Sequence, residues 1–177
     1  NMKILNLIPT KLKKIIKDFT PIAKYLAKKI SSVNSCYFIG RNISYPIALE
    51  GSLKLKEISY LHSEGFPGGE MKHGPIALID KDTMTVCINP NNELYEKSLS
   101  NAQEISARNG KIIILTSVNR TKKGGTEMKV PSLPKENFID TPFIYSIPLQ
   151  LISYYFALNE GTDIDQPRNL AKSVTVE

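Results

Sequence analysis

Three charged side chains are spaced along the segment ALEGSLKLKEISYLH, residues 48–62, so that a helix would bring them together. Glu50, Lys54 and Glu57 fall within about 60° of one another on a helix that turns about 100° per residue. A carboxylate held ionised beside an ammonium can take up and return a proton. The same spacing is also typical of an exposed ion-pair stripe, which contributes about 0.2–0.5 kcal/mol per pair.

The neighbouring residues favour the chemical interpretation over the exposed stripe. Pro46, Ile47 and Leu61 border the charged face, so the face does not merge into a polar surface. The opposite face carries small and apolar residues that allow a helix to approach a sheet closely: Ala48, Gly51, Ser52, Leu55, Ile58 and Ser59. The packing side of the helix is therefore already assigned, and we expect the charges to face a groove.

A second titratable group follows in the segment SEGFPGGEMKHGP, residues 63–75, which contains four glycines and two prolines. This composition predicts a loop of unusual backbone shape. His73, directly after Lys72, is suited to proton transfer near neutral pH. Taken alone, it is more simply interpreted as an ordinary loop histidine, and His62 needs no role beyond binding the last carbonyls of the helix.

Strands and helices alternate along the chain. Short apolar or β-favouring runs predict strands at 35–41, 83–89 and 111–118, with a short edge strand at 128–134. Helical patterns lie at 46–61, 92–110 and 141–159. This order predicts a three-layer α/β/α sandwich with a mainly parallel, flavodoxin-like sheet. Because ligands collect at the carboxyl ends of such strands, we expect Gly40, Asn89 and Ser117 to line that edge.

The positive charge of the chain is concentrated at its beginning. Residues 1–30 hold eight lysines and one acidic residue, Asp18, whereas residues 31–177 hold 15 basic and 16 acidic residues. The lysines are interleaved with apolar residues at helical spacing, which predicts one or two amphipathic helices, broken near Pro21, with their lysines in water. Binding to nucleic acid or a membrane surface is the alternative, and the helical spacing of the apolar residues disfavours it.

Several classes of protein are disfavoured by composition. The 177 residues fit one domain. Cys36 and Cys87 lie inside apolar runs, which predicts buried thiols in a reducing compartment. The chain has two histidines and no CxxC or HExxH pattern, so we expect no metal site. No apolar run approaches the roughly 18 residues of a membrane span, and no signal-peptide pattern is found. We therefore expect a cytoplasmic protein.

Two long strings carry a family resemblance. Residues 45–80, YPIALEGSLKLKEISYLHSEGFPGGEMKHGPIALID, and residues 148–177, PLQLISYYFALNEGTDIDQPRNLAKSVTVE, resemble glucosamine-6-phosphate synthase, the isomerising glutamine:fructose-6-phosphate aminotransferase. KLKEISY, GEMKHGP and DQPRNLAKSVTVE are the most specific parts, and the likeness runs from about residue 37 to the end. It implies the second, C-terminal sugar-isomerase (SIS) domain of an enzyme that also has a glutaminase domain and a first SIS domain.

The resemblance implies a division of the chain into three parts. We expect an N-terminal helical segment that packs on the domain at 1–31, the SIS domain at 32–160, and a tail carrying the active-site lysine at 161–177. A glutaminase needs an N-terminal cysteine, whereas this sequence starts with Asn1 and Met2. The Ser/Thr-rich phosphate loop of the family's first SIS domain has no good equivalent here. We expect a part of a larger synthase that is inactive alone.

The resemblance also implies roles for four residues of the central helix and the tail. Glu57 would be the base that moves a proton between C1 and C2 of the open-chain sugar. Lys54 would lie close to Glu57 and to the substrate oxygens. Glu50 would order this cluster, and Ala171, in the tail, would contact the substrate. These roles give the charged face of the helix its predicted function as the wall of an active site.

Two further residues complete the implied site. Lys172 would form a Schiff base with the C2 carbonyl of fructose 6-phosphate, which acidifies the neighbouring C–H. His73 would assist opening of the furanose ring, reaching the site from the partner subunit of a homodimer. Interconversion of ketose and aldose requires one base that takes a proton and returns it on the next carbon, which a carboxylate can do. The tail would fold over the site and exclude water.

The sequence therefore predicts the isomerase part of the synthase, which converts fructose 6-phosphate and glutamine-derived ammonia to glucosamine 6-phosphate. The resemblance implies no cofactor and no metal. The alternative function is a non-catalytic, phosphosugar-binding regulatory SIS domain. A regulator needs no proton shuttle, so the presence of Glu57, His73 and Lys172 together favours the enzyme.

Overall fold

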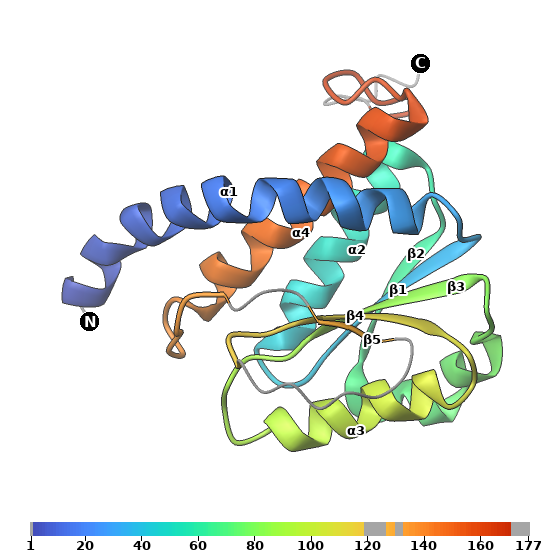
Figure 1. Ribbon diagram of the computed structural model, residues 1–177, viewed down its shortest axis with the longest axis horizontal. Coiled ribbons are helices and arrows are strands. Elements are labelled where there is room, and N and C mark those ends of the chain that lie inside the picture. Colours follow the sequence, from blue (N-terminus) through green and yellow to red (C-terminus); the bar gives the residue numbers. More distant parts are fainter. Residues whose placement is uncertain (1, 119–126, 130–132, 171–177) are drawn as a thin grey trace, which may run out of the picture.

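A parallel β-sheet forms the centre of the protein. The computed structural model describes residues 2–118, 127–129 and 133–170 (Figure 1). Within these residues, five parallel strands are arranged in the order β2-β1-β3-β4-β5. Their bounds are β1 Ser35–Gly40, β2 Ser63–Pro67, β3 Thr83–Ile88, β4 Lys111–Leu115 and β5 Glu127–Lys129. The predicted strands at 35–41, 83–89 and 111–118 are confirmed, with small differences at their ends. The edge strand expected at 128–134 overlaps β5 at residues 128–129 only, residues 130–132 lie outside the described part of the chain, and residues 133–134 are not in a strand.

Helices cover both faces of the sheet, so the predicted three-layer sandwich is confirmed. One face carries α1 Met2–Ile30, α2 Ser44–Ser59 and α4 Thr141–Glu160, which share one apolar core with the sheet (Figure 1). The other face carries α3 Tyr95–Ser106 and two short 3₁₀ helices, η1 Gly68–His73 and η2 Pro75–Leu78. Each face thus has its own core, as expected for a parallel sheet buried on both sides.

The central strands follow directly from the sequence. All residues of β3 are buried, and so are residues 112–115 of β4. Both cysteines lie in strands of the sheet, Cys36 in β1 and Cys87 in β3. They are buried and form no disulfide, as predicted. Gly40 ends β1 where α2 begins, and a Cβ atom there would collide with the carbonyl oxygen of Ser44. Only glycine therefore allows α2 to start so close to the sheet.

The N-terminal segment is a single helix. The expected break near Pro21 is wrong, since α1 runs from Met2 to Ile30 through Pro9 and Pro21. Both prolines lie on the exposed side, where the carbonyl groups that lose a hydrogen-bond donor can turn toward water. The other side of α1 is buried against the domain through Ile8, Ile15, Phe19, Ala23, Leu26, Ala27 and Ile30.

The glycine-rich segment at 63–75 is more regular than its composition suggests. The prediction of an irregular loop is wrong for its first part, because Ser63–Pro67 forms β2 and pairs in parallel with β1. Residues 68–73 form η1, Gly74 follows it with a φ angle of 140°, and Pro75 begins η2. A strand at the edge of a sheet tolerates Pro67 at its end, since one side of the strand has no partner. The glycine and proline content of this segment therefore predicted a loop where the structure has an edge strand.

The burial of α1 predicts a large loss of stability when its contact with the core is removed. Phe19→Ala deletes a ring that is 2% exposed in the core beneath α1. We expect the free energy of unfolding to fall by about 3–5 kcal/mol, since a cavity replaces the ring. Urea denaturation measures it. Leu7→Ala, on a residue of α1 that is 57% exposed, is the control and should change the value by less than about 0.5 kcal/mol.

Candidate functional site

The structure brings Lys54 and Glu57 into direct contact on α2. The Nζ of Lys54 donates a hydrogen bond to Oε2 of Glu57 at 2.8 Å. The side chains are 35% and 25% exposed, respectively, so both are partly buried yet remain accessible. Glu50, one turn before Lys54, is also partly buried. The predicted charged face is therefore real, and it faces away from the buried residues Ala48, Gly51, Ser52 and Leu55.

The electrostatics of this pair fix the protonation state of the lysine. The pKa of Lys54 is raised above its ordinary value of 10.5, first because Glu57 accepts its hydrogen bond. Burial opposes this shift, while the charges of Glu57 and Glu50 add to it. Lys54 is thus a permanent cation at neutral pH. It can orient a carboxylate or an anionic substrate oxygen, but it is not a nucleophile.

The surface next to Lys54 is mostly apolar. A cavity of about 340 Å³ lies between α1, α2 and α4, and Lys54 is the charged residue in its wall. The rest of that wall consists of Ile16, Ile58, Ile147, Gln150, Leu151, Ser153 and Tyr154. Four of these side chains can form hydrogen bonds, Lys54, Gln150, Ser153 and Tyr154, although Ser153 already donates to the carbonyl of Leu149 at 2.9 Å. Glu57 does not line this cavity, so the cavity does not bring a ligand against both members of the Lys54–Glu57 pair.

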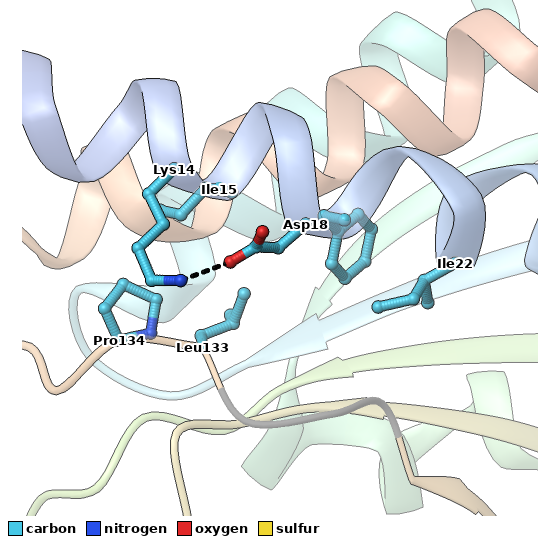
Figure 2. A pocket seen from close by; sticks show the side chains of 7 residues that line it. Lys14, Ile15, Asp18, Ile22, Leu133 and Pro134 are labelled. Carbon is cyan, nitrogen blue, oxygen red and sulfur yellow. Dashed lines mark hydrogen bonds and ion pairs between the residues drawn. The ribbon is translucent and has the colours of Figure 1, made fainter.

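A second cavity on the same face also lacks catalytic groups. It has a volume of about 380 Å³ and lies between α1 and the segment at Leu133 and Pro134. Figure 2 shows that Lys14 and Asp18 of α1 form an ion pair beside it, with a distance of 2.5 Å between Nζ and Oδ2. Its other wall residues are apolar: Ile15, Phe19 and Ile22. The Lys14 and Asp18 side chains are 72% and 53% exposed, so they form a solvated ion pair at the surface and not part of an enclosed site.

His73 and the Lys54–Glu57 pair lie on opposite sides of the sheet. It ends η1, whose Met71 belongs to the core on the α3 side of the sheet. The preceding Lys72 forms an ion pair with Glu104 of α3 at 3.0 Å, which holds this segment on that side. Helix α2 packs on the opposite face. The structure therefore does not bring His73 and Glu57 together within one chain.

The start of the C-terminal tail is attached to the end of α2. Ala171 and Lys172, which were predicted to contact the substrate, lie outside the described residues. Before them, the Oγ1 of Thr162 donates a hydrogen bond to the carbonyl of Ile58 at 2.6 Å. The backbone N–H of Arg168 donates to the hydroxyl of Tyr60 at 2.9 Å. The described tail therefore runs beside the turn that follows Glu57.

Tyr60 is the residue of this region that sequence reasoning missed. It follows α2 in the left-handed conformation, with a φ angle of 64°, and its N–H bonds the carbonyl of Lys56. The guanidinium of Arg168 lies over its ring at 4.1 Å from the centroid. An aromatic residue directly after a helix is a weak signal in sequence, because the partner that stacks on it lies 108 residues away. Geometry alone reveals this contact.

Comparison with known proteins decides the family. The model of the SIS domain matches residues 29–160. The chain belongs to the SIS-domain family. It is 47% identical to the isomerising glutamine–fructose-6-phosphate aminotransferase of Haemophilus influenzae, over 99% of this chain and 29% of the relative. It is 48% identical to the protein of the same name from Sphingobium yanoikuyae, over 86% of this chain and 98% of the relative.

A solved structure agrees with this assignment. The C-terminal domain of glucosamine-fructose-6-phosphate aminotransferase from Francisella tularensis superposes with a TM-score of 0.83 and 38% identity, over 93% of this SIS chain and 46% of that chain. This SIS domain is thus homologous to the C-terminal SIS region of these aminotransferases. It spans under a third of the length of the Haemophilus influenzae relative.

The described residues contain neither a cluster of metal-binding side chains nor a helix that could span a membrane. Residues 2–118, 127–129 and 133–170 of this SIS domain contain no group of three or more His, Cys, Asp or Glu side chains that could hold a metal ion. In the same residues, no helix has the length and hydropathy needed to cross a membrane.

The Lys54–Glu57 pair predicts a measurable pH dependence. A lysine whose pKa is raised on folding stabilises the protein below its ordinary value of 10.5, and this contribution is lost as the pH rises through the higher folded value. Glu57→Gln should lower the pKa of Lys54, which an NMR titration of the Nζ resonance measures. The free energy of unfolding of Glu57→Gln should differ from that of the wild type by a constant amount around neutral pH, and this difference should shrink above pH 10.5. Glu50→Gln should lower the pKa less, and an unchanged value in Glu57→Gln would contradict the pairing.

The contact between Tyr60 and the tail predicts a change in backbone protection. Tyr60→Phe keeps the ring under Arg168 but removes the hydroxyl that accepts its N–H. We expect the Arg168 amide to exchange its hydrogen about fivefold faster, since the lost hydrogen bond is worth about 1 kcal/mol. Hydrogen exchange followed by NMR measures this rate. Tyr25→Phe, on an exposed tyrosine of α1, is the control, and equal rates in all three proteins would disprove the attachment.

Proposed function

We propose that this chain forms the second sugar-isomerase part of a glutamine–fructose-6-phosphate aminotransferase and carries its ketose–aldose step on fructose 6-phosphate. The curated relatives carry the name of that isomerising enzyme. One observation from the structure carries the chemical part of the proposal: the contact of 2.8 Å between Lys54 and Glu57 on the accessible face of α2. A carboxylate that is paired, yet accessible, meets the needs of a proton shuttle.

In this proposal Glu57 takes a proton from one carbon of the open-chain sugar and returns it to the neighbouring carbon. The ammonium of Lys54 holds the carboxylate in position between turnovers through its hydrogen bond of 2.8 Å. Lys54 itself stays protonated, because its pKa is raised by Glu57. A different amine must therefore attack the carbonyl of the substrate. This requirement supports the assignment of that step to Lys172, in keeping with the family resemblance.

The attachment of the tail supports a position of Lys172 near Glu57. Arg168 is bound to Tyr60, which lies three residues after Glu57. Lys172 follows Arg168 by four positions, a length of chain that extends at most about 14 Å. A reach of this size supports the proposal that the amine meets a sugar bound at Glu57. We propose that Lys172 forms the imine at C2 and that Ala171 contacts the same sugar.

The separation of His73 from Glu57 supports a site shared between two copies of the chain. Because η1 and α2 lie on opposite faces of the sheet, His73 of one chain does not reach Glu57 of the same chain. We propose that His73 of a second copy assists ring opening, in a homodimer. Glu50, on the same face as Glu57, keeps its proposed role in ordering the cluster.

We further propose the division into a helical segment at 1–31, the SIS domain at 32–160 and the tail at 161–177. The Haemophilus influenzae relative extends far beyond the matched region, which supports the proposal that a glutaminase and a first SIS domain supply ammonia and the phosphate loop. Residues 1–177 alone would then make little or no glucosamine 6-phosphate. Buried free thiols at Cys36 and Cys87 fit a reducing cytoplasm.

The proposal is tested in an aminotransferase that contains this segment. Glu57→Gln and Lys172→Ala should each lower glucosamine 6-phosphate synthesis by about 10²-fold or more, since each removes a group that acts on the sugar. Glutamine hydrolysis, followed as glutamate release, should remain measurable. Lys56→Ala is the control, because Lys56 lies on the same helix but is exposed.

Borohydride trapping with fructose 6-phosphate separates the two roles. Reduction should attach the sugar to Lys172 in the wild type and in Glu57→Gln, and attach none in Lys172→Ala. Near-normal turnover in either variant would contradict its assigned role. Binding of the sugar phosphate without any trapped imine would instead favour the regulatory alternative.

A further inference from the structure

His73 ends a short helix that needs contacts from outside to keep its position. η1 has six residues, whereas 3₁₀ helices longer than about three or four residues are uncommon because their hydrogen bonds have poor geometry. The side chain of His73 is exposed, so burial of its ring does not fix it. Met71, which is 1% exposed, anchors the middle of η1 in the core. The position of His73 therefore depends on what holds the two ends of this helix.

Arg41 holds the beginning of η1. Gly40 and Pro67 are partners in the parallel pair of β1 and β2, so the residues that follow them, Arg41 and Gly68, lie side by side. The Nε of Arg41 donates a hydrogen bond to Oδ1 of Asn101 on α3 at 3.0 Å. Asn101 is 3% exposed, so its side chain is sheltered from water. Arg41 thus connects the start of η1 to α3.

Two glycines allow this contact. A Cβ atom at Gly68 would lie 3.0 Å from Oδ1 of Asn101, which is closer than most Cβ contacts. A Cβ atom at Gly69 would lie 3.4 Å from Nη1 and 3.5 Å from Nη2 of Arg41. The guanidinium therefore lies against the backbone at the start of η1. The adjacent glycines of the segment SEGFPGGEMKHGP, residues 63–75, thus leave room for the Arg41–Asn101 pair.

A second contact holds the end of η1 on the same side of α3. Lys72, next to His73, pairs with Glu104 at 3.0 Å between Nζ and Oε1. Asn101 and Glu104 are three residues apart on α3, a spacing that places them on one side of the helix. The side chain of Lys72 is 58% exposed, and solvated ion pairs contribute little to stability. The partly buried bond of Arg41 is therefore the stronger of the two contacts.

Arg41 also belongs to the start of α2. Its carbonyl accepts the N–H of Ser44 at 3.0 Å, in the first turn of the helix that carries Glu57. The backbone of Arg41 thus serves the face of the candidate site, and its side chain serves the face of η1. We propose that Arg41, with Asn101 as its partner, is a positioning residue that fixes His73 for ring opening. This inference rests on the role of His73 in the proposed function.

The inference assigns the effect of Arg41 to one chemical step. When the furanose ring opens, the C2–O5 bond breaks, O5 takes up a proton and the 2-hydroxyl gives one up, which leaves the C2 carbonyl and the 5-hydroxyl. An imidazole assists these proton transfers only within hydrogen-bond distance of the sugar. A displacement of about 1 Å can lower such a rate about 10²-fold. Loss of the Arg41 contact should therefore slow ring opening and leave the later proton transfer at Glu57 intact.

A comparison of two sugars, in an aminotransferase that contains this segment, tests the inference. Fructose 6-phosphate closes to a furanose through its 5-hydroxyl, whereas 5-deoxyfructose 6-phosphate lacks that hydroxyl and stays open. Arg41→Lys keeps the charge but loses the planar guanidinium with its Nε donor. It should lower kcat with fructose 6-phosphate at least about tenfold, with little change in KM. With the 5-deoxy sugar its kcat should equal that of the wild type. Asn101→Leu should behave in the same way.

Three further variants serve as controls. Asn101→Asp keeps an acceptor for Nε and should restore the rate that Asn101→Leu loses. Arg108→Ala removes an exposed arginine just after α3 that donates to the carbonyl of Glu104 at 2.7 Å, and turnover of both sugars should stay normal. Glu57→Gln should lose turnover with both sugars, because its proposed proton transfer follows ring opening.

His73→Ala separates this inference from the proposed function. It should lose turnover with fructose 6-phosphate and keep it with the 5-deoxy sugar. Equal losses with the two sugars in Arg41→Lys and Asn101→Leu would show a purely structural role and overturn the inference, and so would normal turnover of both variants with fructose 6-phosphate. Normal turnover of His73→Ala with fructose 6-phosphate would instead contradict the proposed role of His73, and the inference would fail with it.

Discussion

The close packing of α2 on the sheet determines where the charged residues of the candidate site lie. Gly51 faces the core, and a Cβ atom there would approach Leu149 of α4 to 2.7 Å and Phe38 of β1 to 2.9 Å. Ala48 and Leu55 are fully buried on the same side. Because this side of the helix has no freedom to rotate, Lys54 and Glu57 must face outward. A larger residue at position 51 would turn the charged face away from its present direction.

The sheet also divides the chemistry of the chain between its two faces. The side of α2, α4 and α1 holds the Lys54–Glu57 pair and the attached start of the tail. The side of α3 and η1 holds His73, and the ion pair between Lys72 and Glu104 keeps it there. Because the sheet between these two faces is a filled core, His73 and Glu57 are not neighbours within one chain. A site that holds both of them is the reason that a second copy enters our proposal.

The sequence predicted those parts of the structure that depend on local patterns. The spacing of apolar residues predicted the central strands, the charged face of α2 and the buried cysteines, since each depends on residues close in sequence. It did not predict β2, because glycine and proline mask an edge strand that pairs on one side only. It predicted a break near Pro21 that is absent, because burial of Phe19 and its neighbours outweighs a local preference. Contacts such as Arg168 on Tyr60, which join distant residues, leave no local pattern.

The two ends of α2 lie near carboxylates that have different surroundings. Near its C-terminal end, Glu57 is paired with Lys54 on an accessible face of the helix. Beyond its N-terminal end, Oε1 of Glu136 accepts the N–H of Asn91 and the hydroxyl of Tyr145, which ties the segment after β3 to α4. The second carboxylate therefore serves the fold, because its hydrogen bonds join two elements. The first makes its described contact within one helix, which leaves its accessible side for the proton transfer that we propose.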